Sequence, residues 1–596
     1  MPQPASPIRA ILIANRGEIA VRIIRTCREL GVRTVAVYSE GDRAAMHVSM
    51  ADEAFALRGV TAAETYLDVA ALLDVAARAE VDAVHPGYGF LSEDAAFARA
   101  VTEAGLIWIG PSAEAIEALG DKVSARHIAE SVGAPLVPGT ADPVADADGA
   151  LAFARAHGLP VAIKAAHGGG GRGLKVARTM EEIPSQFDSA VREATAAFGR
   201  GECFVERFLD RPRHVETQCL ADAHGTVAVL STRDCTLQRR HQKLIEEAPA
   251  PFLTAEQDRR LREASAAILR AAGYVGAGTC EFLIGQDGTL SFLEVNTRLQ
   301  VEHPVTEEIT GLDLVAEQLR IAAGEELGYD SVPCRGHAIE LRLNGEDPAR
   351  GFLPHPGTIT TLRWPGGPGV RVDTGVRVGS VVSGNFDSMV AKIIVLAPDR
   401  DRAIARARRA VAETVIEGIP TVLPFHELAL AHEAFTAPQG DFRVHTTWIE
   451  TELIDDLASL PGAVPELGED RESPTERVVV EVGGKRLEVV LPAGLGIAGR
   501  AGALSRKRHS ARRRKPTAPA GNQVSAPMQA NVVRCVATNG TDVEAGDVVV
   551  VIEAMKMEQA LSAPCAGRVR GLDVEAGTQV SSGQVLATIE PVEGSD

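Results

Sequence analysis

Two carboxylates and one amide side chain occur in two neighbouring segments of the sequence, Glu281 in the first and Glu294 and Asn296 in the second. Residues 279–284 and 289–295 are apolar-rich and flank a Gly-rich turn, which predicts an antiparallel hairpin. Glu294 and Asn296 share one face of their strand, and the hairpin places Glu281 opposite them. Two carboxylates and an amide oxygen, with phosphate oxygens completing the shell, are a usual ligand set for Mg²⁺. The apolar neighbours argue against a pair of solvated surface acids.

The residues that follow this hairpin combine an anion-binding group with a proton acceptor. Arg298, Gln300 and Glu302 alternate, so in an extended segment their side chains point to one side. An arginine that holds an oxyanion beside a glutamate that takes a proton is an arrangement for general-base catalysis. A salt-bridge network would explain each group alone, whereas their combination favours a catalytic site.

Lysine is rare in this chain, and several lysines stand inside motifs. Nine of the 61 basic residues are lysine, so arginine is the usual cation. Lys164 precedes the Gly-rich run 168–173, Lys122 lies in Gly-Asp-Lys, and Lys243 ends a dense polar run. A Gly-rich hairpin suits a flexible cover whose backbone N–H groups lie over phosphates, and a compact ammonium suits the phosphate charge. The run joins two predicted strands, so it is neither a dinucleotide-binding loop nor a P-loop.

An internal repeat occupies the C-terminal part of the chain. Residues 525–553 align with 562–590 at a fixed offset of 37, with 11 of 29 positions identical. Two β-rich halves related in this way predict a pseudo-two-fold sandwich with the joint at 554–558 forming a hairpin tip. Lys556 lies in that joint, and a primary amine at an exposed tip is well placed for covalent modification.

Composition limits the kind of protein that carries these groups. At about 150 residues per domain, 596 residues predict three or four domains. With 61 basic against 80 acidic residues the net charge is −19, which argues against a general binder of nucleic acid or membrane surfaces. The eight cysteines are scattered and form no C-x-x-C pair. We see no secretory signal pattern and no apolar run near ~18 residues. We therefore expect a cytoplasmic protein.

The hydrophobic periodicity predicts several distinct regions. Residues 8–38 read as strand, helix and strand, and this α/β alternation, typical of nucleotide-binding domains, continues to residue 115. Strand pairs with Gly-rich turns follow, and then a further mixed region. Residues 477–491 predict one short hairpin. The basic run 506–515 contains no aromatic residues, so a solvated linker is favoured over a nucleic-acid site.

Several of these motifs together resemble the biotin carboxylase component of biotin-dependent carboxylases, an ATP-grasp enzyme. The similarity covers residues 8–450 and is carried by NRGEIA, HPGYGFLSE, GDKVSA, IKAAHGGGGRGLKV, RDCTLQRRHQK, FLEVNTRLQVEHPVTE and AIELRLNGEDP. The segment EAMKME around Lys556 resembles the biotinylation site of biotin carboxyl carrier domains, within 524–592. The joined order is similar to the alpha chain of bacterial acyl-CoA carboxylases, especially the actinobacterial acetyl-/propionyl-CoA type.

The resemblance implies an α/β multi-domain fold that ends in an all-β biotinyl/lipoyl-carrier sandwich. The expected regions are a Rossmann-like biotin carboxylase N-terminal domain at 1–115, an ATP-grasp domain at 116–335, a biotin carboxylase C-terminal domain at 336–452, a linker with a short β-hairpin at 453–497, a flexible basic linker at 498–523 and the carrier domain at 524–596.

The resemblance also implies roles for individual residues. Four residues are expected to be catalytic: Glu302, Arg298, Lys243 and Arg342. Glu302 is expected to be the base that deprotonates bicarbonate, and Arg342 is expected to stabilise the biotin enolate. Bicarbonate is expected to meet Lys243, Arg298, Gln300 and the backbone of Val301, and Mg²⁺ (or Mn²⁺) to meet Glu281, Glu294 and Asn296. Biotin is expected on Lys556. The residues expected to bind ATP are Lys122, Lys164, Gly170, Gly171, Glu206, Arg207, Phe208, Leu209, His214, His241, Glu281 and Glu294.

The implied reaction is ATP-dependent carboxylation of carrier-bound biotin through carboxyphosphate. The implied partners are bicarbonate, a biotin protein ligase and a carboxyltransferase beta subunit that receives carboxybiotin, in a hetero-oligomer with homodimeric carboxylase contacts. Neither nucleic acid nor membrane is expected as a partner. The alternatives are an alpha subunit for another acyl-CoA, longer-chain or methylcrotonyl-type, and a non-catalytic biotin carrier scaffold.

Overall fold

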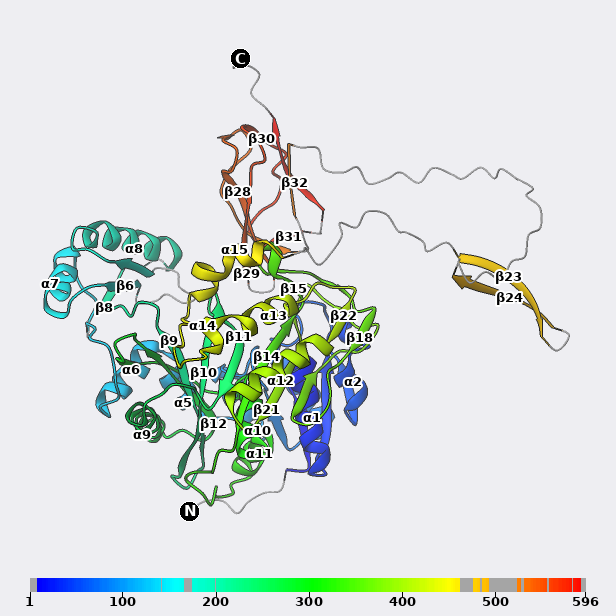
Figure 1. Ribbon diagram of the computed structural model, residues 1–596, viewed down its shortest axis with the longest axis horizontal. Coiled ribbons are helices and arrows are strands. Elements are labelled where there is room, and N and C mark those ends of the chain that lie inside the picture. Colours follow the sequence, from blue (N-terminus) through cyan, green and yellow to red (C-terminus); the bar gives the residue numbers. More distant parts are fainter. Residues whose placement is uncertain are drawn as a thin grey trace. The chain divides into compact units, whose positions relative to one another are not determined.

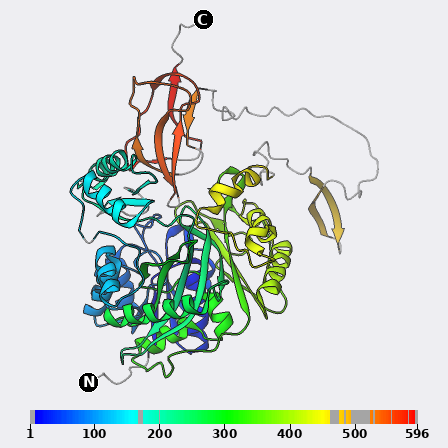
Figure 2. The same ribbon diagram turned by 60° about the vertical axis from the view of Figure 1, so that its left-hand side comes forward.

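The computed structural model divides the chain into two compact units, Met1–Leu460 and Pro461–Asp596. It describes residues 8–140, 142–165, 174–198, 200–460, 475–482, 485–492, 522–526, 530–554, 557–580 and 583–590. Figures 1 and 2 show the elements of each unit, which are described separately below.

A five-stranded parallel sheet begins the first unit, in the order β3-β2-β1-β4-β5. Residues of β1 alternate between two apolar clusters on opposite faces of the sheet, as expected for a parallel strand covered on both sides. The predicted strand, helix and strand over 8–38 are confirmed as β1, α1 and β2. The elements are β1 (Ala10–Ile13), α1 (Gly17–Glu29), β2 (Arg33–Tyr38), η1 (Glu40–Asp42), α2 (Met46–Met50), β3 (Glu53–Ala56), α3 (Val69–Arg78), β4 (Ala83–His85), α4 (Ala95–Glu103) and β5 (Ile107–Trp108).

A small lobe follows, built on a three-stranded antiparallel sheet in the order β7-β6-β8 (Figure 1). The predicted strand pair around the Gly-rich run is confirmed as β6 and β7, while the run itself, within 166–173, lies outside the described residues. Two helices pack against the sheet. The elements from the connection onward are α5 (Ala113–Gly120), α6 (Lys122–Ser131), α7 (Ala147–His157), β6 (Val161–Ala165), β7 (Leu174–Ala177), α8 (Ile183–Phe198) and β8 (Cys203–Arg207).

An eight-stranded antiparallel sheet forms the centre of the first unit, in the order β13-β12-β9-β10-β11-β14-β21-β19. The predicted hairpin is confirmed as β12 and β13, and Glu281 stands directly opposite Glu294 in its register. The strands are β9 (Arg213–Ala221), β10 (Val227–Arg239), β11 (Gln242–Ala248), β12 (Gly276–Ile284), β13 (Leu290–Asn296), β14 (His337–Asn344), β19 (Val370–Thr374) and β21 (Met389–Ala397).

The two faces of this sheet bury different side chains. Along β14, Ile339, Leu341 and Leu343 pack in the large core that includes α12 and α13. Ala338 packs instead with residues of α10, so alternation places Glu340 and Arg342 on the α10 side. The surrounding helices are α9 (Ala255–Ala271), α10 (His303–Thr310), α11 (Leu314–Ala322), α12 (Arg400–Glu413), α13 (Leu423–Ala431), α14 (Glu433–Thr436), the π-helix η3 (Ile449–Leu453) and α15 (Ile454–Ala458).

Short elements complete the C-terminal part of the first unit. Three two-stranded ladders pair β15 with β16, β17 with β20 and β18 with β22. Their bounds are β15 (Glu346–Asp347), η2 (Pro348–Arg350), β16 (Leu353–Pro354), β17 (Gly357–Thr358), β18 (Thr361–Arg363), β20 (Val381–Val382) and β22 (Val415–Glu417). No helix of the described residues is long and apolar enough to cross a membrane.

The second unit contains a hairpin and a β-sandwich. The hairpin predicted at 477–491 is confirmed as β23 (Thr475–Val482) paired with β24 (Lys485–Pro492). The sandwich has two four-stranded sheets, β25-β32-β30-β27 and β29-β28-β26-β31. Its strands are β25 (Gln523–Ser525), β26 (Ala530–Cys535), β27 (Asp542–Val543), β28 (Val548–Ala554), β29 (Met557–Ser562), β30 (Gly567–Arg570), β31 (Gln579–Val580) and β32 (Val585–Glu590).

The strand positions reproduce the sequence repeat. Strands β26, β27 and β28 begin at residues 530, 542 and 548, and β30, β31 and β32 begin 37 residues later in each case. Strands β28 and β29 pair up to Ala554 opposite Met557. The two residues between them, Met555 and Lys556, lie outside the described residues.

Candidate functional site

A row of charged residues crosses the central sheet from strand to strand. Glu294 stands opposite Glu281, Glu281 opposite Glu216 on β9, and Glu216 opposite Arg233 on β10. Directly opposed residues in an antiparallel ladder project to the same face. The sheet register therefore gathers side chains that are far apart in sequence.

Lys243, near the start of β11, is the centre of this cluster. Its Nζ donates to Glu302 Oε1 at 2.6 Å, to Glu216 Oε2 at 2.7 Å and to Glu281 Oε1 at 2.9 Å. An ammonium has three N–H donors, so each one has a carboxylate partner. An isolated charge buried here would be costly, whereas this arrangement compensates the lysine fully.

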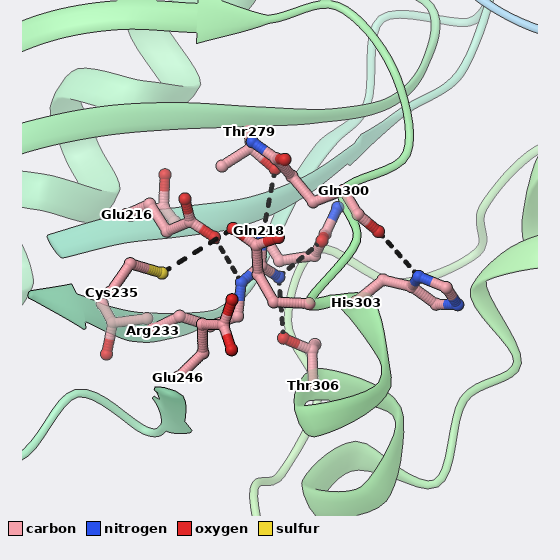
Figure 3. A network of polar contacts seen from close by, with 12 residues as sticks. Glu216, Gln218, Arg233, Cys235, Glu246, Thr279, Gln300, His303 and Thr306 are labelled. Atoms are coloured by element: carbon pink, nitrogen blue, oxygen red, sulfur yellow. Dashed lines mark hydrogen bonds and ion pairs between the residues drawn. The ribbon is translucent and has the colours of Figure 1, made fainter. Parts of the chain in front are cut away.

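Arg233 compensates the remaining carboxylate oxygen of Glu216, as Figure 3 shows. Its Nε donates to Glu216 Oε1 at 2.5 Å, and Nη1 donates to Gln218 Oε1 at 2.6 Å and to Thr306 Oγ1 on α10 at 3.0 Å. Arg233 and Glu216 are both fully buried. Arg233 thereby connects the sheet to the helix that follows Glu302.

Glu302 is the N-cap residue of α10 and is completely buried. Its Oε1 accepts from Lys243, and its Oε2 accepts from Arg342 Nη2 at 2.9 Å. Arg342 also donates through Nε to Glu246, and Cys235 Sγ lies 3.7 Å from Glu302 Oε1. The carboxylate thus sits between two cations, one from β11 and one from β14.

Burial and ion pairing act in opposite directions on these groups. Burial alone would raise the pKa of Glu302, but Lys243 and Arg342 hold it well below its usual range. Burial likewise works against the charge of Lys243, yet the surrounding acids raise its pKa well above the ordinary value. For Glu246 burial prevails and raises the pKa to about 7. At neutral pH Glu302 is therefore an anion and Lys243 a cation.

The predicted anion-binding residues join the same network from the loop before α10. Arg298 Nη1 donates to Gln300 Oε1 at 2.9 Å, and Gln300 Nε2 donates to Glu281 Oε1 at 3.2 Å. The expectation of one extended segment from Arg298 to Glu302 is only partly correct, because the chain turns at Val301 and Glu302 before the helix. The turn directs Glu302 toward Lys243 and Arg342.

The predicted metal ligands lie together on the hairpin. Asn296 Nδ2 donates to Glu281 Oε1 at 2.8 Å, and the other oxygen of Glu281 contacts His214 Nε2 at 2.9 Å. Glu294 is half-buried, and its Oε2 lies 3.5 Å from Lys122 Nζ. Carboxylate and amide oxygens are the donors that Mg²⁺ prefers, so these residues fit the expected ion.

The residues predicted to bind ATP occupy several elements of the first unit. Lys164 on β6 forms an ion pair with Glu206 on β8 within the small lobe, and His214 lies in the central cluster. His241 is exposed at the tip of the β10–β11 hairpin, where its φ is +67°. Arg207 ends β8, Phe208 and Leu209 follow it, and Gly170 and Gly171 lie outside the described residues.

Sequence reasoning missed several members of the cluster. Glu216, Gln218 and Glu246 are buried there, and Glu93 Oε2 accepts from Arg298 Nε at 2.8 Å. One signal was available: His214, Glu216 and Gln218 alternate along one strand, which predicts a polar face. Glu93 is 205 residues from Arg298 and carried no such pattern.

Family models match nearly all of the first unit and the β-sandwich of the second. The model "Biotin carboxylase, N-terminal domain" matches residues 7–116, "Carbamoyl-phosphate synthase L chain, ATP binding domain" matches 121–329, "Biotin carboxylase C-terminal domain" matches 340–451 and "Biotin-requiring enzyme" matches 522–589. With the central sheet and its charged cluster, these matches define a biotin carboxylase of the ATP-grasp class joined to a biotin carrier.

Curated relatives and solved structures that are similar to this chain agree with the family matches. The chain is 56% identical to the "Biotin-dependent acyl-coenzyme A carboxylase alpha3 subunit" of Mycobacterium leprae, over 98% of this chain and 99% of the relative. It is 47% identical to "Biotin carboxylase 1" of Bacillus subtilis, over 74% of this chain and 98% of the relative. The biotin carboxylase domain of the Hydrogenobacter thermophilus 2-oxoglutarate carboxylase, solved with MgADP and bicarbonate, is 42% identical with a TM-score of 0.70 and covers 76% of this chain and 100% of that chain.

The chain therefore belongs to the family of biotin-dependent acyl-CoA carboxylase alpha subunits. It is a ligase with an ATP-binding domain and a domain that carries biotin covalently. The predicted class of enzyme, fold and cofactors are confirmed.

Proposed function

We propose that this chain carboxylates the biotin of its own carrier domain with ATP and bicarbonate, and that a carboxyltransferase beta subunit transfers the carboxyl group to acetyl-CoA or propionyl-CoA. The observation that carries the proposal is the buried Lys243–Glu302–Arg342 arrangement. It combines an anion-binding ammonium, a carboxylate and a guanidinium within direct contact.

Bicarbonate binds at Lys243, Arg298, Gln300 and the backbone of Val301. All three donors of Lys243 are engaged with carboxylates, so the incoming anion replaces one of these contacts. Loss of a cation contact raises the pKa of Glu302 from its depressed value toward that of a useful base. Glu302 then accepts the bicarbonate proton, and the bicarbonate oxygen attacks the γ-phosphate of ATP to give carboxyphosphate and ADP.

ATP phosphates are held by lysines from two sides. Lys122 begins α6 and Lys164 lies on β6 of the small lobe, and both are ammonium groups in a chain that otherwise prefers arginine. His214, His241, the segment Glu206–Leu209 and the run containing Gly170 and Gly171 complete the nucleotide site. Glu281, Glu294 and Asn296 hold Mg²⁺, which neutralises phosphate charge as the γ-phosphoryl group is transferred.

Arg342 stabilises the negative charge that develops on biotin. Its guanidinium is buried and paired with Glu246 and Glu302, so its orientation is fixed before biotin arrives. A donor held in place at a developing oxyanion requires little reorganisation during the reaction. Biotin on Lys556 would supply the nucleophilic ureido nitrogen. The phosphate released with CO₂ from carboxyphosphate would take the proton of that nitrogen, and Arg342 would hold the resulting enolate oxygen while the nitrogen bonds to CO₂.

The partners are supported by the relatives and by the chain itself. The Mycobacterium leprae relative is named as one subunit of an acyl-CoA carboxylase, which supports a separate beta subunit here, and attachment of biotin requires a biotin protein ligase. All eight cysteines are free thiols, which supports work in the cytoplasm. A longer-chain or methylcrotonyl-type acyl-CoA is the alternative acceptor. A non-catalytic scaffold is disfavoured because it has no need of compensated charges buried around Glu302.

We further propose the domain limits 1–115, 116–335, 336–452 and 524–596, with linkers at 453–497 and 498–523. The family matches begin and end close to the four domain limits.

The test uses the full, biotinylated chain. Phosphate release from ATP should require bicarbonate, and radiolabelled bicarbonate should become acid-labile label on the protein. Adding the co-purified beta subunit with a panel of acyl-CoAs should transfer the label fastest to acetyl-CoA or propionyl-CoA. ATP cleavage that ignores bicarbonate would contradict the carboxylase proposal, and preferential transfer to a longer acyl-CoA would contradict only the acceptor.

A further inference from the structure

A second buried lysine lies directly behind the catalytic turn. Lys392 on β21 is fully buried, and its Nζ donates to the backbone carbonyl of Val301 at 2.9 Å. The same Nζ lies 3.2 Å from Glu18 Oε1 on α1, and Tyr88 OH donates to that oxygen. Lys392 thus joins the N-terminal sheet region to the turn between Gln300 and Glu302.

The sheet register fixes where this ammonium points. Lys392 stands opposite Arg342 on β14 and opposite Asp373 on β19, so all three project to the α10 face. Arg342 reaches Glu302 from that face, and Lys392 reaches the adjacent residue, Val301. Neighbouring strands therefore hold two consecutive residues of the turn, one by its side chain and the other by its backbone.

The turn itself has a second backbone anchor. His303 Nδ1 lies 2.7 Å from the carbonyl oxygen of Gln300, and burial, followed by the nearby cations, keeps the pKa of His303 well below its usual value. The ring is therefore neutral and donates its proton to that carbonyl. With the carbonyls of Gln300 and Val301 both held, the peptide planes on either side of Val301 have little freedom to rotate.

We propose that Lys392 is a positioning residue that orients the Val301 peptide and, through it, the side chains of Gln300 and Glu302 for bicarbonate. This inference rests on the bicarbonate site proposed above. A compact ammonium suits the role because its three donors diverge and can meet a carboxylate and a carbonyl together. The competing explanation is that Lys392 serves only as the buried ion-pair partner of Glu18.

Two variants separate these explanations. Lys392→Met removes the donor but leaves Glu18 buried without its cation, which destabilises the fold. The double variant Glu18→Met/Lys392→Met removes both charges, and apolar replacement of a whole buried pair is often tolerated. If Lys392 positions the turn, the folded double variant should lose about tenfold or more in kcat for bicarbonate-dependent ATP cleavage, because small misplacements of reacting groups cost up to about 100-fold. Its KM for bicarbonate should rise, while its KM for ATP stays within about twofold.

Two control variants accompany the measurement. Glu18→Gln removes the ion pair but keeps the bond from Lys392 to Val301, so its kcat should stay within about threefold of wild type. Arg16→Met removes a different cation, which pairs with Asp42 and stacks on Phe386 at 4.4 Å. It should lower the melting temperature without changing the KM for bicarbonate.

The outcome is decisive in either direction. A folded double variant with wild-type kcat and bicarbonate KM would overturn the positioning role. Equal losses in the double variant, Glu18→Gln and Arg16→Met would also overturn it, in favour of a purely structural ion pair. If wild-type ATP cleavage proves independent of bicarbonate, the proposed function fails rather than this inference alone.

Discussion

Replacing Glu302 by glutamine changes one atom at the centre of the charged cluster. The carboxylate accepts from Lys243 at one oxygen and from Arg342 at the other. A carboxamide has one oxygen and one NH₂ group, so one of these cations must face a donor. The base is lost and one strong contact becomes repulsive in the same substitution.

The expected effects on catalysis and stability are both large. Loss of a general base costs about 100-fold or more in kcat, which is about 2.7 kcal/mol of barrier. Breaking a buried ion pair costs about 3–5 kcal/mol. We expect about 3 kcal/mol here, because Lys243 keeps Glu216 and Glu281 and Arg342 keeps Glu246.

The pH dependence follows from the direction of the shift. The pKa of Glu302 in the folded protein lies well below 4.5, its value when unfolded. A carboxylate of this kind contributes stability above its unfolded pKa, and that contribution is lost as the pH falls through the folded pKa. The stability gap between wild type and Glu302→Gln should therefore be full at neutral pH and narrow below pH 4.5.

The assay is bicarbonate-dependent phosphate release, measured well below the melting temperature of the variant, with ATP binding measured separately. Glu340→Gln is the matched control, since Glu340 is equally buried on the α10 face of the same sheet. Burial raises its pKa well above the usual value, so a neutral amide of the same shape avoids the cost of a buried charge there and activity should be retained. A kcat for folded Glu302→Gln within about threefold of wild type, under about 0.7 kcal/mol, would refute the general-base role.

Three further predictions concern other residues. Lys556→Arg should abolish biotinylation and streptavidin binding while carboxylation of free biotin survives, and loss of free-biotin activity would contradict two independent modules. Glu340→Gln should unfold at equal or higher denaturant concentration than wild type at pH 8. Because the pKa of Glu340 is raised in the folded protein, wild type loses stability as the pH rises above 4.5, so the difference in stability between the two proteins should shrink toward pH 5. A difference that stays constant with pH would show that Glu340 is ionised in the folded protein. Glu294→Gln should raise the Mg²⁺ concentration needed for half-maximal ATP cleavage by about tenfold or more, and an unchanged Mg²⁺ titration would remove Glu294 from the metal site.

The local parts of the site follow from sequence. Alternation and turn residues predict the β12–β13 hairpin, and they predict that Glu281 lies opposite the strand with Glu294 and Asn296. The bulge after Glu281 could not be predicted from these patterns, because a register shift depends on packing on both faces of the sheet. The start of α10 at Glu302 also depends on context, since alternation alone favours a longer extended segment.

The long-range parts of the site could not be derived in this way. Lys243 contacts Glu216 and Glu302, which are 27 and 59 residues away. These contacts depend on the strand order β12-β9-β10-β11-β14, in which β12 pairs with β9 rather than with β11. Sequence periodicity identifies strands and hairpins, but the free energy that selects among possible strand orders is spread over the whole core.

The choice of lysine over arginine links composition to the site. At Lys243 three carboxylates approach from different strands, and a tetrahedral ammonium can direct one donor to each, whereas a planar guanidinium presents its donors as a fixed fork. At Arg342 the two partners, Glu246 and Glu302, suit such a fork. In a chain with nine lysines among 61 basic residues, a lysine buried among polar partners therefore indicates a place where the geometry of the ammonium matters as well as its charge. Lys392, which meets a carbonyl and a carboxylate at once, satisfies the same criterion.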